Sequence, residues 1–183
     1  SDKKNAHDNV YNGANDNASG CTAVLQIGKK LANKHFDQNV LLVLFTGEES
    51  GLLGSNHLSK KLKADSFNLA FMLNFEMLGK TYSKGMDMVY ITGFDKSDMA
   101  QNMNKIVNKE FVNYFDGAQK MNLFQRSDNY SFYKEFNVPC QTISSFDFTN
   151  YDYYHHVKDE VSELDIKNLD DIINTSTVII ESI

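Results

Sequence analysis

Apolar residues along the chain follow two spacings that alternate from one end to the other. Continuous or alternating apolar runs, which are typical of strands, cover residues 39–46, 67–75, 86–92 and 139–144. Apolar residues at helical spacing cover residues 18–34, 54–62, 97–111, 128–136 and 162–183. Strands that alternate with helices predict a mainly parallel sheet covered by helices on both faces, which is an α/β fold.

The most informative stretch joins one predicted strand to the helix that follows it. Residues 40–45 have the length and composition expected of a buried strand, and Gly47 separates them from the adjacent carboxylates Glu48 and Glu49. Open α/β sheets place their chemistry at the carboxyl ends of their strands. Because adjacent residues point in different directions, one carboxylate can hold a metal ion while the other moves a proton.

Three further places put side chains that bind metals next to predicted strands or helices. Asp16 lies in a turn of small residues, Glu76 follows a predicted strand, and His155 and His156 follow a tyrosine-rich stretch. Oxygen donors with one imidazole suit zinc, and also manganese or cobalt. Each residue alone is more often a solvated charge, a helix cap or part of an aromatic cluster. Together they predict a metal site at one edge of the sheet.

Composition narrows the class of protein and the kind of partner. The 183 residues suffice for one domain, and the 42% hydrophobic fraction is typical of a globular chain. The formal net charge of -6, with no basic stripe, argues against nucleic acid as the main partner. No apolar run approaches the roughly 20 residues that span a bilayer. Cys21 and Cys140 are too few for a disulfide framework, and we expect buried free thiols.

Five sequence blocks together resemble a known family. In chain order they are GANDNASG, FTGEESGLLGS, LNFEMLG, SDNYSF and YYHHVKDE, within residues 8–160. They resemble the aminopeptidase Y family of zinc exopeptidases, which includes secreted bacterial leucyl aminopeptidases, glutamate carboxypeptidase and, as a relative, glutaminyl cyclase. The resemblance implies a three-layer α/β/α sandwich with a mainly parallel mixed sheet. It also implies two zinc ions that share a bridging carboxylate and a water.

The resemblance further implies roles for individual residues. Asp16 resembles the bridging aspartate, Glu48 the general base, and Glu49 a ligand of one zinc ion. Glu76 stands where the family often has an aspartate ligand of the other ion. The replacement adds one methylene but keeps a hard anionic donor, so we expect Glu76 to bind with some change in metal preference or geometry.

The final ligand of the family is a histidine four positions before an aspartate. His155 and Asp159 match that spacing, so His155 is the first choice and His156 the second. Asp159 either orients the imidazole of His155 or is an ordinary loop charge.

A substrate pocket is implied by the block that precedes the predicted helix at residues 128–136. Ser127 and Asp128 lie in this block, and Tyr154 belongs to the tyrosine-rich stretch that could form a wall of the same pocket. A helix N-cap at Ser127 or Asp128 and ordinary aromatic packing of the tyrosine are equally open interpretations.

One family ligand has no clear counterpart in this sequence. It is a histidine of a His-x-Asp block at the end of an upstream strand, and the chain offers only His7, followed directly by Asp8. We therefore interpret residues 1–183 as a single catalytic domain truncated at its N-terminus, which lacks the first strands and the first His ligand. The alternative is that His7 replaces that ligand from an unusual loop.

The function implied is that of a zinc-dependent aminopeptidase, which hydrolyses N-terminal residues from peptides with a metal-activated water. One alternative is a catalytically incomplete fragment or a non-catalytic module of the same fold. Another is acyl transfer like that of glutaminyl cyclase, with one zinc ion. The resemblance alone suggests a secreted or periplasmic protein. Loss of the first strands would expose a sheet edge and core surface, so we also expect self-association.

Overall fold

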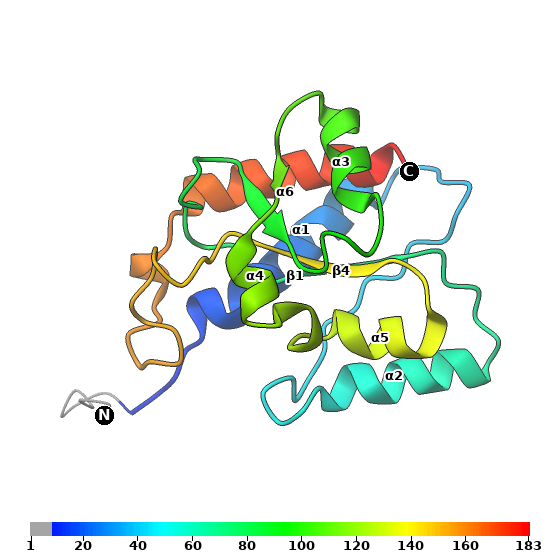
Figure 1. Ribbon diagram of the computed structural model, residues 1–183, viewed down its shortest axis with the longest axis horizontal. Helices are drawn as coiled ribbons and strands as arrows, with labels where there is room; N and C mark the ends of the chain where they lie inside the picture. Colours follow the sequence, from blue (N-terminus) through cyan, green and yellow to red (C-terminus); the bar gives the residue numbers. More distant parts are fainter. Residues whose placement is uncertain (1–8) are drawn as a thin grey trace. The chain divides into compact units, whose positions relative to one another are not determined.

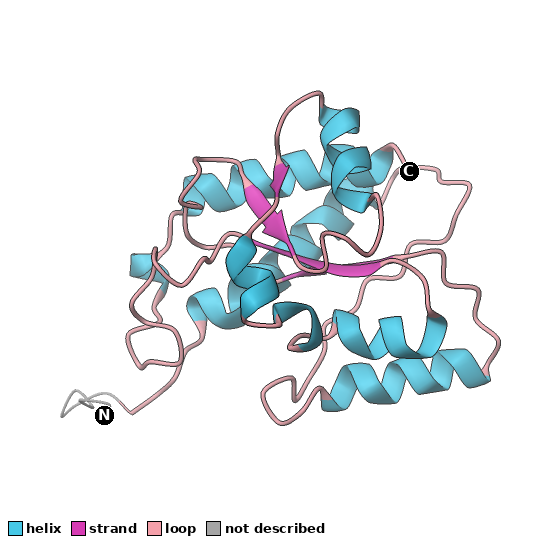
Figure 2. Cartoon of the chain, in the orientation of Figure 1, coloured by secondary structure: helices cyan, strands magenta, loops and turns pink. Residues whose placement is uncertain are grey.

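The computed structural model describes residues 9–183, and the chain divides into two compact units. The first unit comprises Ser1–Leu42, Phe75–Val89 and Ser144–Ile183, and the second comprises Val43–Asn74 and Tyr90–Ile143. Figure 1 follows the elements along the chain, and Figure 2 distinguishes helices, strands and loops. No helix within residues 9–183 has the length and apolar character needed to cross a membrane.

Two long helices pack together in the first unit. The turn η1 (Ala14–Ser19) leads into α1 (Gly20–Leu31), and the short helix η3 (Val161–Glu163) precedes α6 (Ile166–Glu181). α1 packs against α6, as Figure 1 shows in blue and red. Each helix carries a stripe of buried apolar residues at helical spacing, and burying that stripe stabilises the helix. These buried residues are Ala23, Ile27, Leu31, Leu169, Ile172, Ile173 and Ile179.

Most of the sheet belongs to the second unit. Its order is β1 (Met72–Phe75), β4 (Cys140–Ser144), β2 (Val89–Ile91) and β3 (Val112–Asn113). All residues of β2 and β4 are buried. The strand ends Phe75, Val89 and Ser144 are assigned to the first unit. The chain therefore passes from the second unit to the first between Asn74 and Phe75, one residue before Glu76.

Five helices of the second unit surround or follow these strands. α2 (Leu53–Ala64) packs against α5 (Asn129–Phe136), and α3 (Met99–Val107) packs against β3. The short helices α4 (Asp116–Lys120) and η2 (Leu123–Gln125) lie next to each other.

The predicted helices and three of the four predicted strands are confirmed, with different ends. The helix predicted at residues 18–34 is the shorter α1, and the one predicted at 162–183 begins later, as α6. The strand predicted at residues 67–75 is reduced to β1, and the one at 86–92 is reduced to β2. Periodicity located the elements because it reports which face is buried, and it does not fix where each one ends.

The prediction of a buried strand at residues 39–46 is wrong. This stretch belongs to no strand, and the sheet of the described chain offers it no neighbour. Most of its apolar side chains are exposed: Leu41 is 54% accessible, and Leu42 and Leu44 are each 48% accessible. A strand needs a partner for its N–H and C=O groups, and apolar composition alone does not supply one.

Both cysteines are free thiols, but only one is fully buried. Cys140 in β4 is inaccessible to solvent, and burial raises the pKa of its thiol to about 12. Cys21 in α1 is only partly buried. The sequence-based expectation of two buried thiols therefore holds for Cys140 alone.

Candidate functional site

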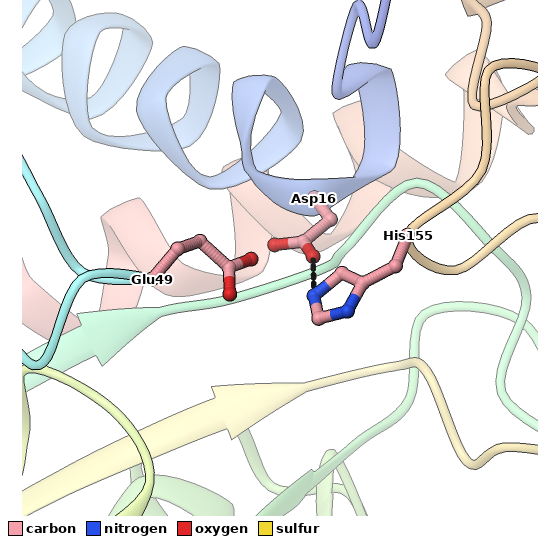
Figure 3. A group of neighbouring side chains, drawn as sticks. All are labelled: Asp16, Glu49 and His155. Carbon is pink, nitrogen blue, oxygen red and sulfur yellow. Dashed lines mark ion pairs between the residues drawn. The ribbon is translucent and has the colours of Figure 1, made fainter.

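Two of the predicted metal ligands meet in the first unit. Nε2 of His155 lies 3.2 Å from Oδ2 of Asp16, as the dashed line in Figure 3 shows. The side chain of Asp16 is 12% exposed and that of His155 is 50% exposed, so the pair lies at the surface with the carboxylate on the inner side. Figure 3 also draws Glu49, which belongs to the second unit. A carboxylate oxygen and an imidazole nitrogen at this distance are donors that zinc accepts.

The turn that carries Asp16 depends on glycine at its start. Gly13 has φ 63°, a left-handed conformation that side chains disfavour. A Cβ at residue 13 would also lie 2.5 Å from the carbonyl oxygen of Asp16. The N–H of Ala18 donates to the carbonyl of Gly13 at 2.9 Å and closes the turn. The small residues of the GANDNASG block therefore let the chain fold tightly around Asp16.

This turn is hydrogen-bonded to the segment that carries Glu76. Nδ2 of Asn17 donates to the carbonyl of Phe75 at 3.0 Å, and its Oδ1 accepts from the N–H of Met77 at 3.0 Å. These two bonds bracket Glu76 on the main chain. Among the described residues, however, Glu76 does not join Asp16 and His155 in a group of ligand atoms within 4.8 Å of one another.

Glu76 acts electrostatically on a neighbouring thiol of the first unit. Burial and, second, the negative charge of Glu76 raise the pKa of Cys21. Glu76 itself is partly buried. The structure therefore places Glu76 close enough to Cys21, at the start of α1, for its charge to act on that thiol.

The two neighbouring histidines have different surroundings. The ring of His155 stacks on Tyr154 with centroids 3.8 Å apart and an angle of 27° between the planes. Nδ1 of His156 instead accepts a hydrogen bond from the N–H of Lys158 at 3.1 Å. The structure therefore brings the first-choice histidine to Asp16. His7, the other histidine considered as a ligand, lies outside the described residues.

Tyr154 belongs to an aromatic cluster of the same unit. Its ring centroid lies 5.3 Å from that of Phe146 and 5.9 Å from that of Phe148. The packing interpretation of Tyr154 is thus visible in the structure, and its contact with substrate remains a prediction.

Glu48 and Glu49 lie on a tight turn of the second unit that leads into α2. The carbonyl of Glu48 accepts from the N–H groups of Gly51 and Leu52 at 2.9 and 2.8 Å. Gly47 has φ 67° and Gly51 has φ 102°, so the turn requires glycine twice. Glu48 is partly buried and Glu49 is exposed. Glycines at these two positions therefore allow the turn, and hydrogen bonds within its own main chain close it.

Ser127 and Asp128 are buried at the start of α5 in the second unit. Ser127 Oγ accepts from Nδ2 of Asn74 at 2.8 Å. Asp128 occupies the N-cap position, but its side chain makes no capping hydrogen bond. Among the described residues, its Oδ1 has no hydrogen-bond partner. Burial raises the pKa of Asp128, and a hydrogen bond with Ser55 opposes that shift.

Comparison with known proteins gives one family and several relatives. The family model described as Peptidase family M28 matches residues 1–180. A probable zinc metalloprotease of Pyrenophora tritici-repentis is 38% identical over 69 residues, which cover 38% of this chain and 14% of that protein. A probable leucine aminopeptidase of Arthroderma benhamiae is 32% identical over 166 residues, which cover 86% of this chain and 42% of that protein.

Comparison with solved structures shows that the fold is similar to that of a known protein. The chain superimposes on BSAP, a zinc aminopeptidase from Bacillus subtilis, with a TM-score of 0.76 and 20% identity, covering 93% of this chain and 42% of that one. This likeness confirms the predicted α/β, zinc-exopeptidase-like fold class. The chain spans less than half the length of each of these three proteins.

Proposed function

The chain belongs to peptidase family M28, and we propose that the whole protein is a zinc-dependent aminopeptidase acting on peptides. The observation that carries the proposal is the approach of Asp16 to His155, 3.2 Å apart, where the sequence predicted two zinc ligands. The names of the relatives, a probable zinc metalloprotease and a probable leucine aminopeptidase, support zinc and the release of N-terminal residues.

We assign the zinc ligands as the sequence resemblance suggests. Asp16, Glu49, Glu76 and His155 would hold the zinc, with Asp16 in the position of the bridging carboxylate and with Glu49 and Glu76 serving different ions. Bound zinc supplies a Lewis acid, which lowers the pKa of a bound water and polarises the substrate carbonyl.

The chain itself supplies the proton transfer. A carboxylate oxygen of Glu48 accepts a proton from the attacking water and donates it to the nitrogen of the leaving amine. The turn hydrogen bonds to the Glu48 carbonyl fix the main chain at this residue, which supports a base of defined position. Ser127, Asp128 and Tyr154 are proposed to line the substrate pocket. For Ser127 and Asp128, burial favours an indirect contribution.

Two properties of the whole protein belong to the same proposal. Secretion rests on the sequence resemblance alone, and cell fractionation tests it. Self-association is supported by the exposed apolar side chains of Leu41, Leu42 and Leu44. Sedimentation of the purified protein over a range of concentrations tests this second property.

The proposal is tested by separating the roles of two adjacent carboxylates. In the whole protein, Glu48→Gln should lower kcat on an aminoacyl anilide by about 10²- to 10⁴-fold and leave zinc content unchanged. Glu49→Gln is the matched comparison and should lower both. Activity and zinc content are measured on the same preparations. Loss of zinc from the Glu48 variant would show that base and ligand are misassigned.

The glutaminyl cyclase-like alternative is tested with a second substrate. An aminopeptidase releases the amine of an aminoacyl anilide, whereas a cyclase converts an N-terminal glutaminyl peptide and loses ammonia. Turnover of the glutaminyl peptide alone would favour the cyclase. Absence of turnover with both substrates, in protein that binds zinc, would favour a non-catalytic module.

A further inference from the structure

We propose that Asp159 is a positioning residue for the metal centre, which holds the Asp16 turn in place by binding three consecutive main-chain N–H groups. This inference rests on the proposed function, because it assigns Asp159 to the site formed by Asp16 and His155. Sequence resemblance left Asp159 either as a partner of the His155 imidazole or as a loop charge. The contacts support a third role.

The hydrogen bonds of Asp159 form a continuous series. Its carbonyl accepts from the N–H of Ala14 at 3.1 Å. Its Oδ1 accepts from the N–H of Asn15 at 2.7 Å, and its Oδ2 accepts from the N–H of Asp16 at 3.0 Å. One residue thus satisfies the first three main-chain donors of η1, which lie at the start of a helical turn without partners inside it.

The burial of Asp159 shows that these bonds are needed. Its accessible fraction is 2%, and a carboxylate buried to that extent is costly unless it is hydrogen-bonded. A fourth bond comes from Oη of Tyr151 to Oδ1 at 2.7 Å. Burial and, second, the hydrogen bond with Asp159 raise the pKa of Tyr151, so the phenol remains a donor at neutral pH. Hydrogen bonds to both oxygens therefore offset the free-energy cost of burying this carboxylate.

The same residue also closes the loop that carries His155. The N–H of Asp159 donates to the carbonyl of His156 at 2.9 Å. Within the described residues, its side-chain bonds go to Asn15, Asp16 and Tyr151, and none goes to the imidazole of His155. Asp159 therefore connects the two ligand-bearing loops through their main chains. Partners of this kind typically affect metal affinity by about 10- to 100-fold.

The test compares two equally buried carboxylates of the first unit in the whole protein. Asp159→Asn puts an amide donor opposite a main-chain N–H, so zinc affinity should fall by about 10- to 100-fold. Asp147→Asn is the control. Asp147 is 3% exposed and accepts from the N–H groups of Ser83 and Thr149, so its replacement should leave zinc affinity unchanged. Tyr151→Phe removes only the fourth bond and should weaken zinc binding by less than about 10-fold.

Two readouts separate positioning from mere stabilisation. Zinc affinity is measured by competition with a chelator at a temperature where every variant is folded. Hydrogen exchange of the amides of residues 14–16 reports their hydrogen bonds to Asp159, and it should accelerate in the Asp159 variant with or without zinc. Unchanged exchange at these amides would show that Asp159 does not hold the turn. Faster exchange with unchanged zinc affinity would overturn the positioning role.

The proposed function fails in a different way. A wild-type protein that binds no zinc would refute both the function and the positioning role. If wild-type protein binds zinc and cleaves peptides while Asp159→Asn does so equally well, the function stands and this inference is wrong.

Discussion

The two units hold their proposed site residues in opposite ways. In the second unit, the turn around Glu48 and Glu49 closes on itself, because the N–H of Gly54 reaches the carbonyl of Thr46 at 2.9 Å. In the first unit, the turn around Asp16 is held by Asp159, 143 residues away in the sequence. The turn of the second unit is held by local hydrogen bonds, whereas the turn of the first unit is held only when the distant segment has folded against it.

In the second unit a site residue is positioned by its own segment, whereas in the first unit it is positioned by a segment that is distant in the sequence. A locally closed turn is largely specified by its own glycines, so changes elsewhere should affect it little. A turn held from a distance is lost whenever the other segment moves, even if its own sequence is intact. Variants in the two regions should therefore change zinc binding and turnover in different proportions.

The largest effect is expected in the first unit when His155, the proposed ligand that contacts Asp16, is replaced. His155→Asn should reduce zinc affinity by more than about 100-fold, since a ligand should matter more than a supporting residue. Turnover should fall to background with it. Asparagine is chosen because His155 has φ 55°, which asparagine tolerates better than most residues. Zinc content and kcat on an aminoacyl anilide are measured together.

The neighbouring histidine provides the control for this variant. His156→Asn changes a partly buried imidazole whose Nδ1 accepts from the N–H of Lys158. Zinc content and kcat should both remain close to wild type. Equal loss in the two variants would show that the choice of His155 over His156 is wrong.

An intermediate effect is expected where the local turn is disturbed. A Cβ at Gly54 would lie 2.7 Å from the carbonyl oxygen of Thr46, so Gly54→Ala must displace main chain. We expect a loss of about 1–3 kcal/mol in the free energy of unfolding. The resulting shift of Glu48 should lower kcat by about 10- to 100-fold. Denaturant unfolding and steady-state kinetics measure these two quantities.

Ser50→Ala is the matched change on the same turn. Ser50 is exposed, and its replacement should alter stability by no more than about 0.5 kcal/mol. In both variants Asp16 and His155 keep their own contacts. Zinc content should therefore be unchanged in Ser50→Ala, and lowered but not abolished in Gly54→Ala, because Glu49 is the one proposed ligand on this turn. If Gly54→Ala removes zinc completely while the protein remains folded, the disturbance reaches the Asp16 turn and the two regions are not independent.

The same contrast explains how much of the candidate site could be predicted from the sequence. Glu48 and Glu49 were proposed because adjacent carboxylates follow an apolar run and Gly47, and Asp16 because it lies in a block of small residues. The choice of His155 over His156 rested on family spacing, since both histidines lie in the same tyrosine-rich stretch. The hydrogen bonds of Asp159 could not be predicted, because no local pattern records a partner 143 residues away.

The fold shows the same limit in its strands. Helices such as α1 and α6 were predictable because each makes its own main-chain hydrogen bonds and shows its buried face in its spacing. Residues 39–46 have the composition of a strand, but a strand is completed by a neighbour that composition does not identify. The strand prediction at residues 39–46 was therefore wrong because strand pairing depends on segments that are distant in the sequence.

The smallest effect concerns a buried carboxylate that contrasts with Asp159. Asp128 is 7% exposed, and among the described residues its Oδ1 has no hydrogen-bond partner, whereas both oxygens of Asp159 are bonded. Burial raises the pKa of Asp128 above 3.8, so the folded state favours the protonated carboxyl. Its stabilising effect is complete below that value and is lost as pH rises through the raised pKa.

Asp128→Asn should therefore gain stability relative to wild type as pH rises from about 4 to about 7. Ser127→Ala is the control: it is buried next to Asp128 but does not titrate, so its difference from wild type should not change with pH. Both are measured by denaturant unfolding across this range. A difference between Asp128→Asn and wild type that stays constant with pH would mean that the carboxylate is ionised at no cost. In that case the two buried carboxylates would be held alike, and the contrast between the units would be confined to their ligand-bearing loops.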